Sequence, residues 1–207
     1  MVDTQVRPSD VTKFPVIRAL LTVPRENFVP DDKREAAYAG GNIALADRRV
    51  VLEARTLAKM LDALDIQPDE LVLDIGAGLG YSSAVIASLA EAVVALEDDE
   101  SMAKEAQRLL GENGVDNVAV INAPLNAGAP RHGPYDVIVI EGGVEHVPAA
   151  IIDQLKDGGR IAALFNEGGL GLCRIGYKLD DEVSWRFAFN AGAPTLPGFE
   201  GPKRFTL

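Results

Sequence analysis

From residue 71 onward, apolar residues fall into short, nearly continuous runs separated by amphipathic stretches. Runs such as "LVLDI" (71–75) and "AVVALE" (92–97) lack the alternation of a half-exposed strand and are typical of parallel strands buried on both faces. Strands alternating with helices predict an α/β fold, a doubly wound, mostly parallel sheet with helices on both faces. The predicted strands are 71–75, 92–97, 117–122, 135–141 and 160–165, and the predicted helices are 82–90, 99–114 and 148–159.

Two further apolar runs, 171–179 and 183–189, follow one another without an intervening helix. Consecutive strands that lack a crossover connection pair antiparallel. We therefore expect an antiparallel edge at the C-terminal end of the sheet. The Pro- and Gly-rich stretch 189–199 is placed either to cover a site or to form an oligomer contact.

The first seventy residues show helical and irregular patterns. Ser9 or Asp10 is expected to cap a first helix, and a second helix is expected over 54–65. The apolar positions of the first helix are Val11, Phe14, Ile17, Leu20 and Leu21. The 207 residues suit a single domain, with an N-terminal helical extension (1–70) and an α/β core (71–207).

Charge narrows the choice of partners. The formal net charge is −11. An acidic protein repels nucleic acid and anionic membrane surfaces unless it carries a local basic patch. Basic residues form only short clusters, such as Lys33-Arg34 and Arg48-Arg49. We therefore expect neither nucleic acid nor a membrane as a partner.

Cysteine and histidine are scarce. The single cysteine, Cys173, excludes an intramolecular disulfide and is expected to be a buried apolar residue. The N-terminal residues lack the apolar core of a signal peptide, and no apolar run reaches the roughly 18 residues of a membrane span. We expect a cytoplasmic protein. The two histidines, His132 and His146, belong to no metal-ligand spacing, so no metal site is expected.

The sequence "LDIGAGLGYSS" (73–83) is the strongest local signal. Three glycines at alternate positions follow a predicted strand, and a helix is expected to start near Tyr81. Such glycines permit unusual backbone angles and let a ligand approach the main chain. Because these sheets bind ligands at the carboxyl ends of their strands, the turn predicts a cofactor site. The residues assigned to it are Asp74, Gly76, Ala77, Gly78, Gly80, Tyr81 and Glu97.

Two cofactors suit such a turn. A dinucleotide-binding turn requires a small residue at the place occupied by Tyr81, so the spacing for NAD is wrong by one. Glu97 closes the next strand, where a carboxylate can accept both hydroxyls of a ribose. Asp74, just before the first glycine, suits a cationic or zwitterionic ligand better than a diphosphate. These features favour S-adenosyl-L-methionine over NAD, and a glycine turn without a ligand is the remaining alternative.

Two other polar groups have more than one interpretation. Glu141, Glu145 and His146 follow the fourth predicted strand, either as a general base beside two acids or as a solvated loop. Arg48 and Arg49 either bind an acidic substrate or form a solvated basic pair.

Several segments occur in an order that resembles the protein-L-isoaspartate O-methyltransferase family. The resemblance runs from about residue 19 to 161 and implies a seven-stranded class I methyltransferase fold with an N-terminal helical extension. It also implies methyl transfer from S-adenosylmethionine to the α-carboxylate of isoaspartyl residues in damaged proteins. The matching segments are "VPRENFVP" (23–30), "AY" (37–38), "LDIGAGLGYSSAVIASLA" (73–90), "NVAV" (117–120), "GPYDVIVI" (133–140) and "QLKDGGRI" (154–161).

The chain departs from this family on the substrate side and at the adenine contact. The family usually has Thr-Ile-Ser where this chain has Val50, Val51 and Leu52, and the serine there is regarded as catalytic or substrate-positioning. The other departures replace Gly-Asp-Gly by Ala123, Pro124 and Leu125, Thr-Ala-Ala by "EGG" (141–143), and a Pro-rich stretch by "AGGNIALAD" (39–47). Leu52 removes a hydrogen-bond donor, and Glu141 adds negative charge near the expected carboxylate substrate.

The resemblance therefore implies an S-adenosylmethionine-dependent O-methyltransferase of protein repair, with isoaspartyl-containing proteins as partners. Methyl transfer to a carboxylate depends on positioning more than on acid–base chemistry, so no catalytic residue is assigned. Two alternatives stay open. One is a methyltransferase with a different acceptor, and the other is a non-catalytic member that still binds S-adenosylmethionine.

Overall fold

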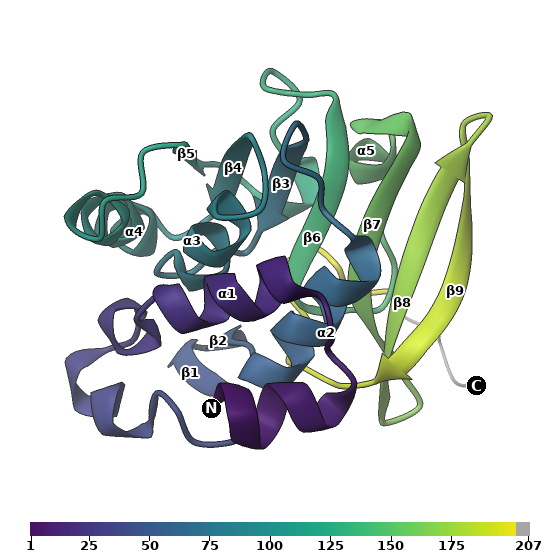
Figure 1. Ribbon diagram of the computed structural model, residues 1–207. Coiled ribbons are helices and arrows are strands. Elements are labelled where there is room, and N and C mark those ends of the chain that lie inside the picture. The colour runs from purple at the N-terminus through teal and green to yellow at the C-terminus, as the bar shows by residue number, and fades with distance from the viewer. Residues whose placement is uncertain (202–207) are drawn as a thin grey trace, which may run out of the picture.

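The computed structural model describes residues 1–201, and a seven-stranded sheet forms the centre of this part of the chain (Figure 1). Its strands are β3 (Leu71–Ile75), β4 (Ala92–Glu97), β5 (Val118–Asn122), β6 (Tyr135–Val144), β7 (Leu155–Glu167), β8 (Leu170–Leu179) and β9 (Glu182–Asn190). The strand order is β5-β4-β3-β6-β7-β8-β9. Chain order reverses between β3 and β6, which is where open α/β sheets bind ligands.

The five strands from β5 to β7 pair in parallel, and β8 pairs antiparallel with both β7 and β9. Both the parallel core and the antiparallel edge predicted from the sequence are confirmed. The interior of β3 and β6 is fully buried, as their continuous apolar runs require. Cys173, on β8, is buried as expected.

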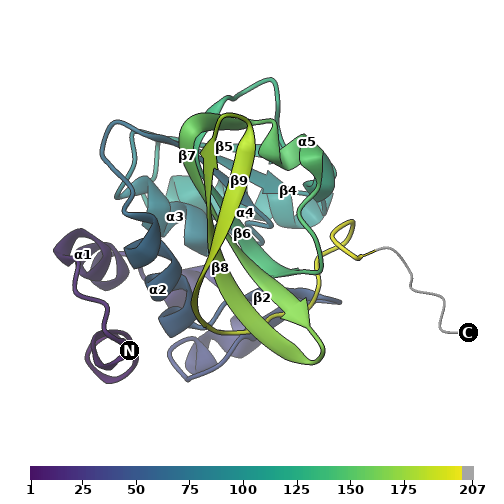
Figure 2. The ribbon, with the colours of Figure 1, turned by 90° about the vertical axis from the view of Figure 1, so that its right-hand side faces the viewer.

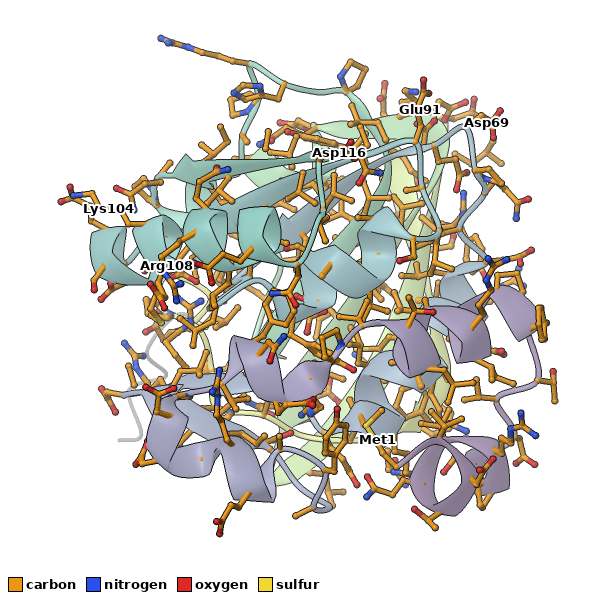
Figure 3. All side chains as sticks on the ribbon, turned by 60° about the vertical axis from the view of Figure 1, so that its left-hand side comes forward. Met1, Asp69, Glu91, Lys104, Arg108 and Asp116 are labelled. Atoms are coloured by element: carbon orange, nitrogen blue, oxygen red, sulfur yellow. The ribbon has the colours of Figure 1, made fainter. Side chains whose placement is uncertain are left out.

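Two layers cover the sheet (Figure 2). The helices are α1 (Phe14–Thr22), α2 (Ala54–Leu64), α3 (Tyr81–Ala87), α4 (Glu100–Glu112) and α5 (Ala149–Ile152). Helices α1 to α4 contribute to the apolar cluster on one face. The other face packs against α5, the short helix η5 (Leu125–Ala127) and the C-terminal segment. Lys104 and Arg108 point outward from α4, where they pair with acidic residues of the same helix (Figure 3).

Two helix predictions were wrong in their bounds. The first helix begins at Phe14 because Pro15 suits a first turn, and Asp10 adopts a left-handed conformation (φ 64°), so neither Ser9 nor Asp10 caps it. The helix predicted over 148–159 keeps only the four residues of α5, since the chain already joins β7 at Leu155. The second helix predicted over 54–65 is confirmed as α2.

The N-terminal seventy residues also contain a β-hairpin, where the sequence predicts only helical and irregular structure. Strands β1 (Ile43–Ala46) and β2 (Arg49–Val51) pair antiparallel as a separate two-stranded sheet. Four short helices precede it: η1 (Val2–Val6), η2 (Arg7–Ser9), η3 (Arg25–Phe28) and η4 (Asp31–Ala36). Within residues 1–201, no helix has both the length and the apolar character to cross a membrane.

The chain after β9 returns across the sheet to the carboxyl end of β6. The amide of Gly143 donates to the Pro194 carbonyl, and the amide of Leu196 donates to the Gly143 carbonyl, both at 2.9 Å. Leu196 and Phe199 are buried in the apolar cluster on that face. The segment therefore covers this edge of the sheet, as one of the two roles expected for the stretch 189–199 requires, and the oligomer contact stays a prediction.

Candidate cofactor-binding site

The glycine turn lies at the carboxyl edge of the sheet, between β3 and α3. The φ angles of Gly76, Gly78 and Gly80 are +83°, +57° and +94°, a region that residues with a Cβ rarely occupy. The amides of Gly76 and Ala77 donate to the carbonyl of Leu96 at 2.9 and 3.2 Å. The turn is thus anchored to the end of β4 through main-chain hydrogen bonds.

Glu97 ends β4 and is completely buried beside the turn. Its Oε2 accepts a hydrogen bond from the Gly78 amide at 2.7 Å, and its Oε1 accepts one from the Asp99 amide at 3.1 Å. Burial raises the pKa of Glu97, against the opposing effect of the Arg49 guanidinium. Glu97, the acid expected to hold a ribose, is therefore held in place against the backbone of the glycine turn.

Asp74, near the end of β3, is also completely buried. Its Oδ2 accepts hydrogen bonds from the hydroxyls of Ser82 and Ser83 on α3, at 2.7 and 2.5 Å. Its Oδ1 has no hydrogen-bond partner among residues 1–201. Burial raises the pKa of Asp74 to about 6, although both serine hydroxyls lower it.

A cavity of about 10 Å³, enough for about one water molecule, lies next to Gly76 and Ala77 of the turn. Two buried polar atoms of its lining, Oε1 of Glu141 and the hydroxyl of Tyr81, have no hydrogen-bond partner in the described part of the chain. Burial and the charge of Asp74 raise the pKa of Glu141 well above its ordinary value. The lining residues are Val50, Val51, Leu52, Leu57, Gly76, Ala77, Tyr81, Ser82 and Glu141.

Arg25, from the "VPRENFVP" segment, connects the N-terminal extension to this region. It is 1% exposed, and its guanidinium donates to the carbonyls of Ala37 and Leu52 at 2.8 and 2.7 Å. The guanidinium carbon lies 4.6 Å from the centre of the Tyr81 ring, in a cation–π contact. Burial lowers the pKa of Arg25. The segment of Arg25 carries the family resemblance, but nothing in the local sequence pattern indicates that this side chain belongs to the site.

Arg49 reaches from the hairpin into the site. Its guanidinium binds Glu97 through two nitrogens, with Nη1 to Oε1 at 2.7 Å, and Nη1 also binds Asp98 at 2.6 Å. Arg49 is buried, whereas Arg48 is exposed and pairs with Glu200 at 2.6 Å. The interpretation of a solvated basic pair therefore holds for Arg48 and is wrong for Arg49. Arg48 lies in the turn of the hairpin with φ +55°, whereas Arg49 is the first residue of β2 and shares its buried face with Val51.

Two leucines fill the space in front of the glycines. A methyl group placed on Gly78 would lie 2.5 Å from Cδ1 of Leu45, on β1. Methyl groups on Gly76 and Gly142 would lie 3.4 and 2.5 Å from side-chain atoms of Leu196, in the C-terminal segment. The backbone that glycine leaves open to a ligand is therefore covered by side chains of this chain.

The chemistry of the site fits S-adenosylmethionine. Among residues 1–201, the buried acids Asp74 and Glu141 each keep one oxygen without a hydrogen-bond partner, which suits a cationic group. Glu97 suits a ribose. The space itself is taken by Arg49, Leu45 and Leu196, which all come from segments outside the seven-stranded sheet.

The remaining candidate residues are separated by the fold. Glu141 is buried, whereas Glu145 and His146 are exposed, so the three do not form one catalytic group. Leu52, at the serine position of the family resemblance, is 1% exposed. Leu125, at one of the adenine-side positions, is buried in η5.

The sheet, its helices and the glycine turn define an α/β protein of the class I methyltransferase fold. Comparison with solved structures agrees: a protein-L-isoaspartate O-methyltransferase superposes with a TM-score of 0.81 at 24% identity, over 93% of this chain and 63% of that chain. A Plasmodium falciparum structure assigned to the same enzyme, in complex with S-adenosyl-L-homocysteine, superposes with a TM-score of 0.79 at 16% identity, over 92% and 94%.

Sequence comparison narrows the class. The family model "Protein-L-isoaspartate(D-aspartate) O-methyltransferase (PCMT)" matches residues 3–184. Protein-L-isoaspartate O-methyltransferases of Syntrophus aciditrophicus and Gloeobacter violaceus are 35% and 36% identical over 161 residues, covering 78% of this chain and 74% and 78% of those proteins. The chain belongs to the protein-L-isoaspartate O-methyltransferase family, a family of S-adenosylmethionine-dependent protein methyltransferases.

Proposed function

We propose that this protein binds S-adenosylmethionine at the glycine turn and transfers its methyl group to a carboxylate of damaged proteins. The observation that carries the proposal is the pairing of the turn with Glu97, whose Oε2 accepts the Gly78 amide. This hydrogen bond supports the assignment of Glu97 as the acid that would hold the ribose, beside the backbone that would approach the cofactor. Family membership supplies the reaction class.

The cofactor would be held by seven residues with separate roles. The turn (Gly76, Ala77, Gly78 and Gly80) shapes the backbone, Asp74 supports the methionine end, Glu97 holds the ribose, and Tyr81 begins the helix beside the cofactor. S-adenosylmethionine supplies an electrophilic methyl group on a sulfonium. The protein's own contribution is to exclude water and to align the two reactants, because a carboxylate acceptor is already nucleophilic.

Isoaspartyl residues are the acceptor that the family indicates, and the proposed setting is the cytoplasm. Two residues favour a second candidate, a methyltransferase with a different acceptor. Leu52 offers no hydroxyl to position a carboxylate. Glu141 is a buried acid, and one of its oxygens has no hydrogen-bond partner in the part of the chain that the structure describes. It repels a carboxylate when ionised and attracts a cationic or hydroxylic group.

The test is calorimetric titration with S-adenosylmethionine, followed by methylation of an isoaspartyl peptide. Binding together with methylation of the isoaspartyl peptide, and not of its aspartyl counterpart, would support the first proposal. Binding without peptide methylation would favour the second candidate or a non-catalytic member. No binding by the wild-type protein or by a folded Arg49→Met variant would reject both methyltransferase proposals.

A further inference from the structure

We propose that Arg49 is a built-in competitor of the cofactor. Its side chain occupies the place of the cofactor ribose on Glu97, so that binding requires the β1–β2 hairpin to withdraw. This inference rests on the proposed binding of S-adenosylmethionine at the glycine turn. Under this proposal, the contact between Arg49 and Glu97 controls whether the cofactor can bind.

The contact engages the whole carboxylate. Two nitrogens of Arg49 bind the two oxygens of Glu97, and Asp98 takes a further hydrogen bond at 2.6 Å. Arg49 and Glu97 side chains are 5% and 0% exposed. A bidentate guanidinium–carboxylate pair in such surroundings is strong and little screened by salt. Ribose hydroxyls that seek Glu97 must therefore displace Arg49 first.

The same segments cover the rest of the turn. A methyl group on Gly76 would lie 3.5 Å from Nη2 of Arg49 as well as 3.4 Å from Leu196, and Leu45 covers Gly78. Since these side chains meet the glycine backbone directly, they take the volume that a cofactor would need. One movement of the hairpin would remove both Arg49 and Leu45.

The covering segments are attached to the sheet differently from its own strands. The hairpin is a separate two-stranded sheet with a register irregularity between Ala44 and Ala46. An exposed ion pair, Arg48 to Glu200 at 2.6 Å, links it to the C-terminal segment. The side chain of Asn42, just before β1, also donates to the Gly192 carbonyl at 3.1 Å. Exposed contacts of this kind contribute little to stability, so these two hold the covers together only weakly.

Competition of this kind lowers the apparent affinity for the cofactor, because only the open fraction of the protein binds it. Replacing Arg49 by methionine keeps a long side chain and removes the charge and the donors. We expect Arg49→Met to bind S-adenosylmethionine at least tenfold more tightly than the wild-type protein. Leu196→Ala, which leaves the ion pair in place, is expected to tighten binding by a smaller factor.

A matched control lies at the opposite end of the sheet. Arg160 pairs with Glu70 through two nitrogens and donates to the carbonyl of Leu64 at 2.8 Å. Arg160→Met thus removes a comparable half-buried pair without touching the glycine turn. We expect it to lower the melting temperature and to leave the dissociation constant for S-adenosylmethionine within about twofold of the wild-type value.

Hydrogen exchange of the ligand-free proteins tests the closure separately from cofactor binding. Arg49→Met should speed exchange in residues 41–53, and Arg160→Met should not. The far-ultraviolet circular dichroism spectrum shows whether each variant is folded. If Arg49→Met does not fold, the affinity of Leu196→Ala for S-adenosylmethionine still tests the proposal.

The outcomes separate the two proposals. Tighter binding by Arg49→Met, with faster exchange in the hairpin, supports the competitor. If the wild-type protein binds S-adenosylmethionine, and folded Arg49→Met and Leu196→Ala bind it equally or less tightly, the proposal that Arg49 competes with the cofactor is overturned. The proposed function then still stands. No binding by the wild-type protein or by either variant overturns the proposed function, and the competitor with it.

Discussion

The hydroxyl of Ser83 donates to Oδ2 of Asp74 over 2.5 Å, from the first turn of α3 to the end of β3. Ser82 donates to the same oxygen at 2.7 Å, which leaves Oδ1 without a partner in the described part of the chain. The two serines thus hold the carboxylate in one orientation. The other oxygen, Oδ1, is the one that the proposal assigns to the cationic part of the cofactor.

Asp74→Asn should therefore weaken binding of S-adenosylmethionine about tenfold or more, since a charge-assisted contact of about 1–3 kcal/mol is lost. Asparagine keeps the size of the side chain and can still accept the serine hydrogen bonds. Asp69→Asn is the matched control, because Asp69 is exposed in the turn before β3. Calorimetric titration measures both variants. Unchanged affinity in Asp74→Asn would remove this acid from the site.

The raised pKa values of Asp74 and Glu141 predict how stability depends on pH. Burial raises the pKa of Asp74 from 3.8 to about 6, and that of Glu141 is raised well above 4.5. Between about pH 4 and pH 6 the unfolded chain loses the Asp74 proton while the folded protein retains it. The contribution of Asp74 to the free energy of unfolding therefore falls as the pH rises through this window.

We expect the double variant Asp74→Asn/Glu141→Gln to be more stable than the wild-type protein at pH 7.5, and this difference to shrink toward pH 4. Urea unfolding at both pH values measures it. A stability difference that does not change with pH would show that neither acid is perturbed in the folded protein.

Glu141→Gln by itself tests which acceptor the site prefers. If the acceptor is an isoaspartyl carboxylate, Glu141→Gln should lower the KM for an isoaspartyl peptide at pH values above the raised pKa of Glu141, where a repulsive charge disappears, and should change it little below that pKa. Glu145→Gln is the control, since Glu145 is exposed four residues away. A KM that rises in Glu141→Gln alone would point to a cationic or hydroxylic acceptor instead.

The sequence predicted the part of the molecule whose elements each show a strong local pattern. Strands such as β3 and β4 are continuous apolar runs, and the three glycines mark the turn between strand and helix. The hairpin was missed because β1 and β2 are four and three residues long, too short to show a period. Arg48 and Arg49 are chemically identical in the sequence, and only their positions on the hairpin make one exposed and the other an ion-pair partner of Glu97.

The closing of the site depends on contacts between distant parts of the chain. Arg49 and Glu97 are 48 residues apart, and Leu196 reaches Gly142 and Gly76 from the C-terminal segment. The hydrophobic periodicity of a single segment does not indicate contacts between residues so far apart in the sequence. The sequence therefore predicts the residues that suit a cofactor, whereas the side chains that compete with it emerge only from the fold.

Leu52→Ser restores the hydroxyl that the family resemblance places here. Because Leu52 is 1% exposed beside the cavity, we expect the substitution to lower the free energy of unfolding by about 3 kcal/mol. If isoaspartyl activity declined through loss of this hydroxyl, peptide methylation should nevertheless increase. Leu64→Ser, at an equally buried position at the end of α2, should show the loss of stability without the gain. Equal methylation rates in the two variants would exclude a role for this hydroxyl.

Arg25 is expected to hold the N-terminal extension against the site. Arg25→Met would leave the carbonyls of Ala37 and Leu52 without their donor and would remove the cation–π contact with Tyr81. An unsatisfied buried carbonyl costs about 1–3 kcal/mol, so we expect a loss of about 2–4 kcal/mol in the free energy of unfolding.

The exposed Arg34, in the neighbouring helix η4, provides the control, and Arg34→Met should change stability by less than about 0.5 kcal/mol. Urea unfolding compares the two variants. Because Arg25 fixes the main chain at Leu52, hydrogen exchange around residues 50–53 should also increase in Arg25→Met. A stable Arg25→Met with unchanged exchange there would mean that the extension is held to the site by apolar packing alone.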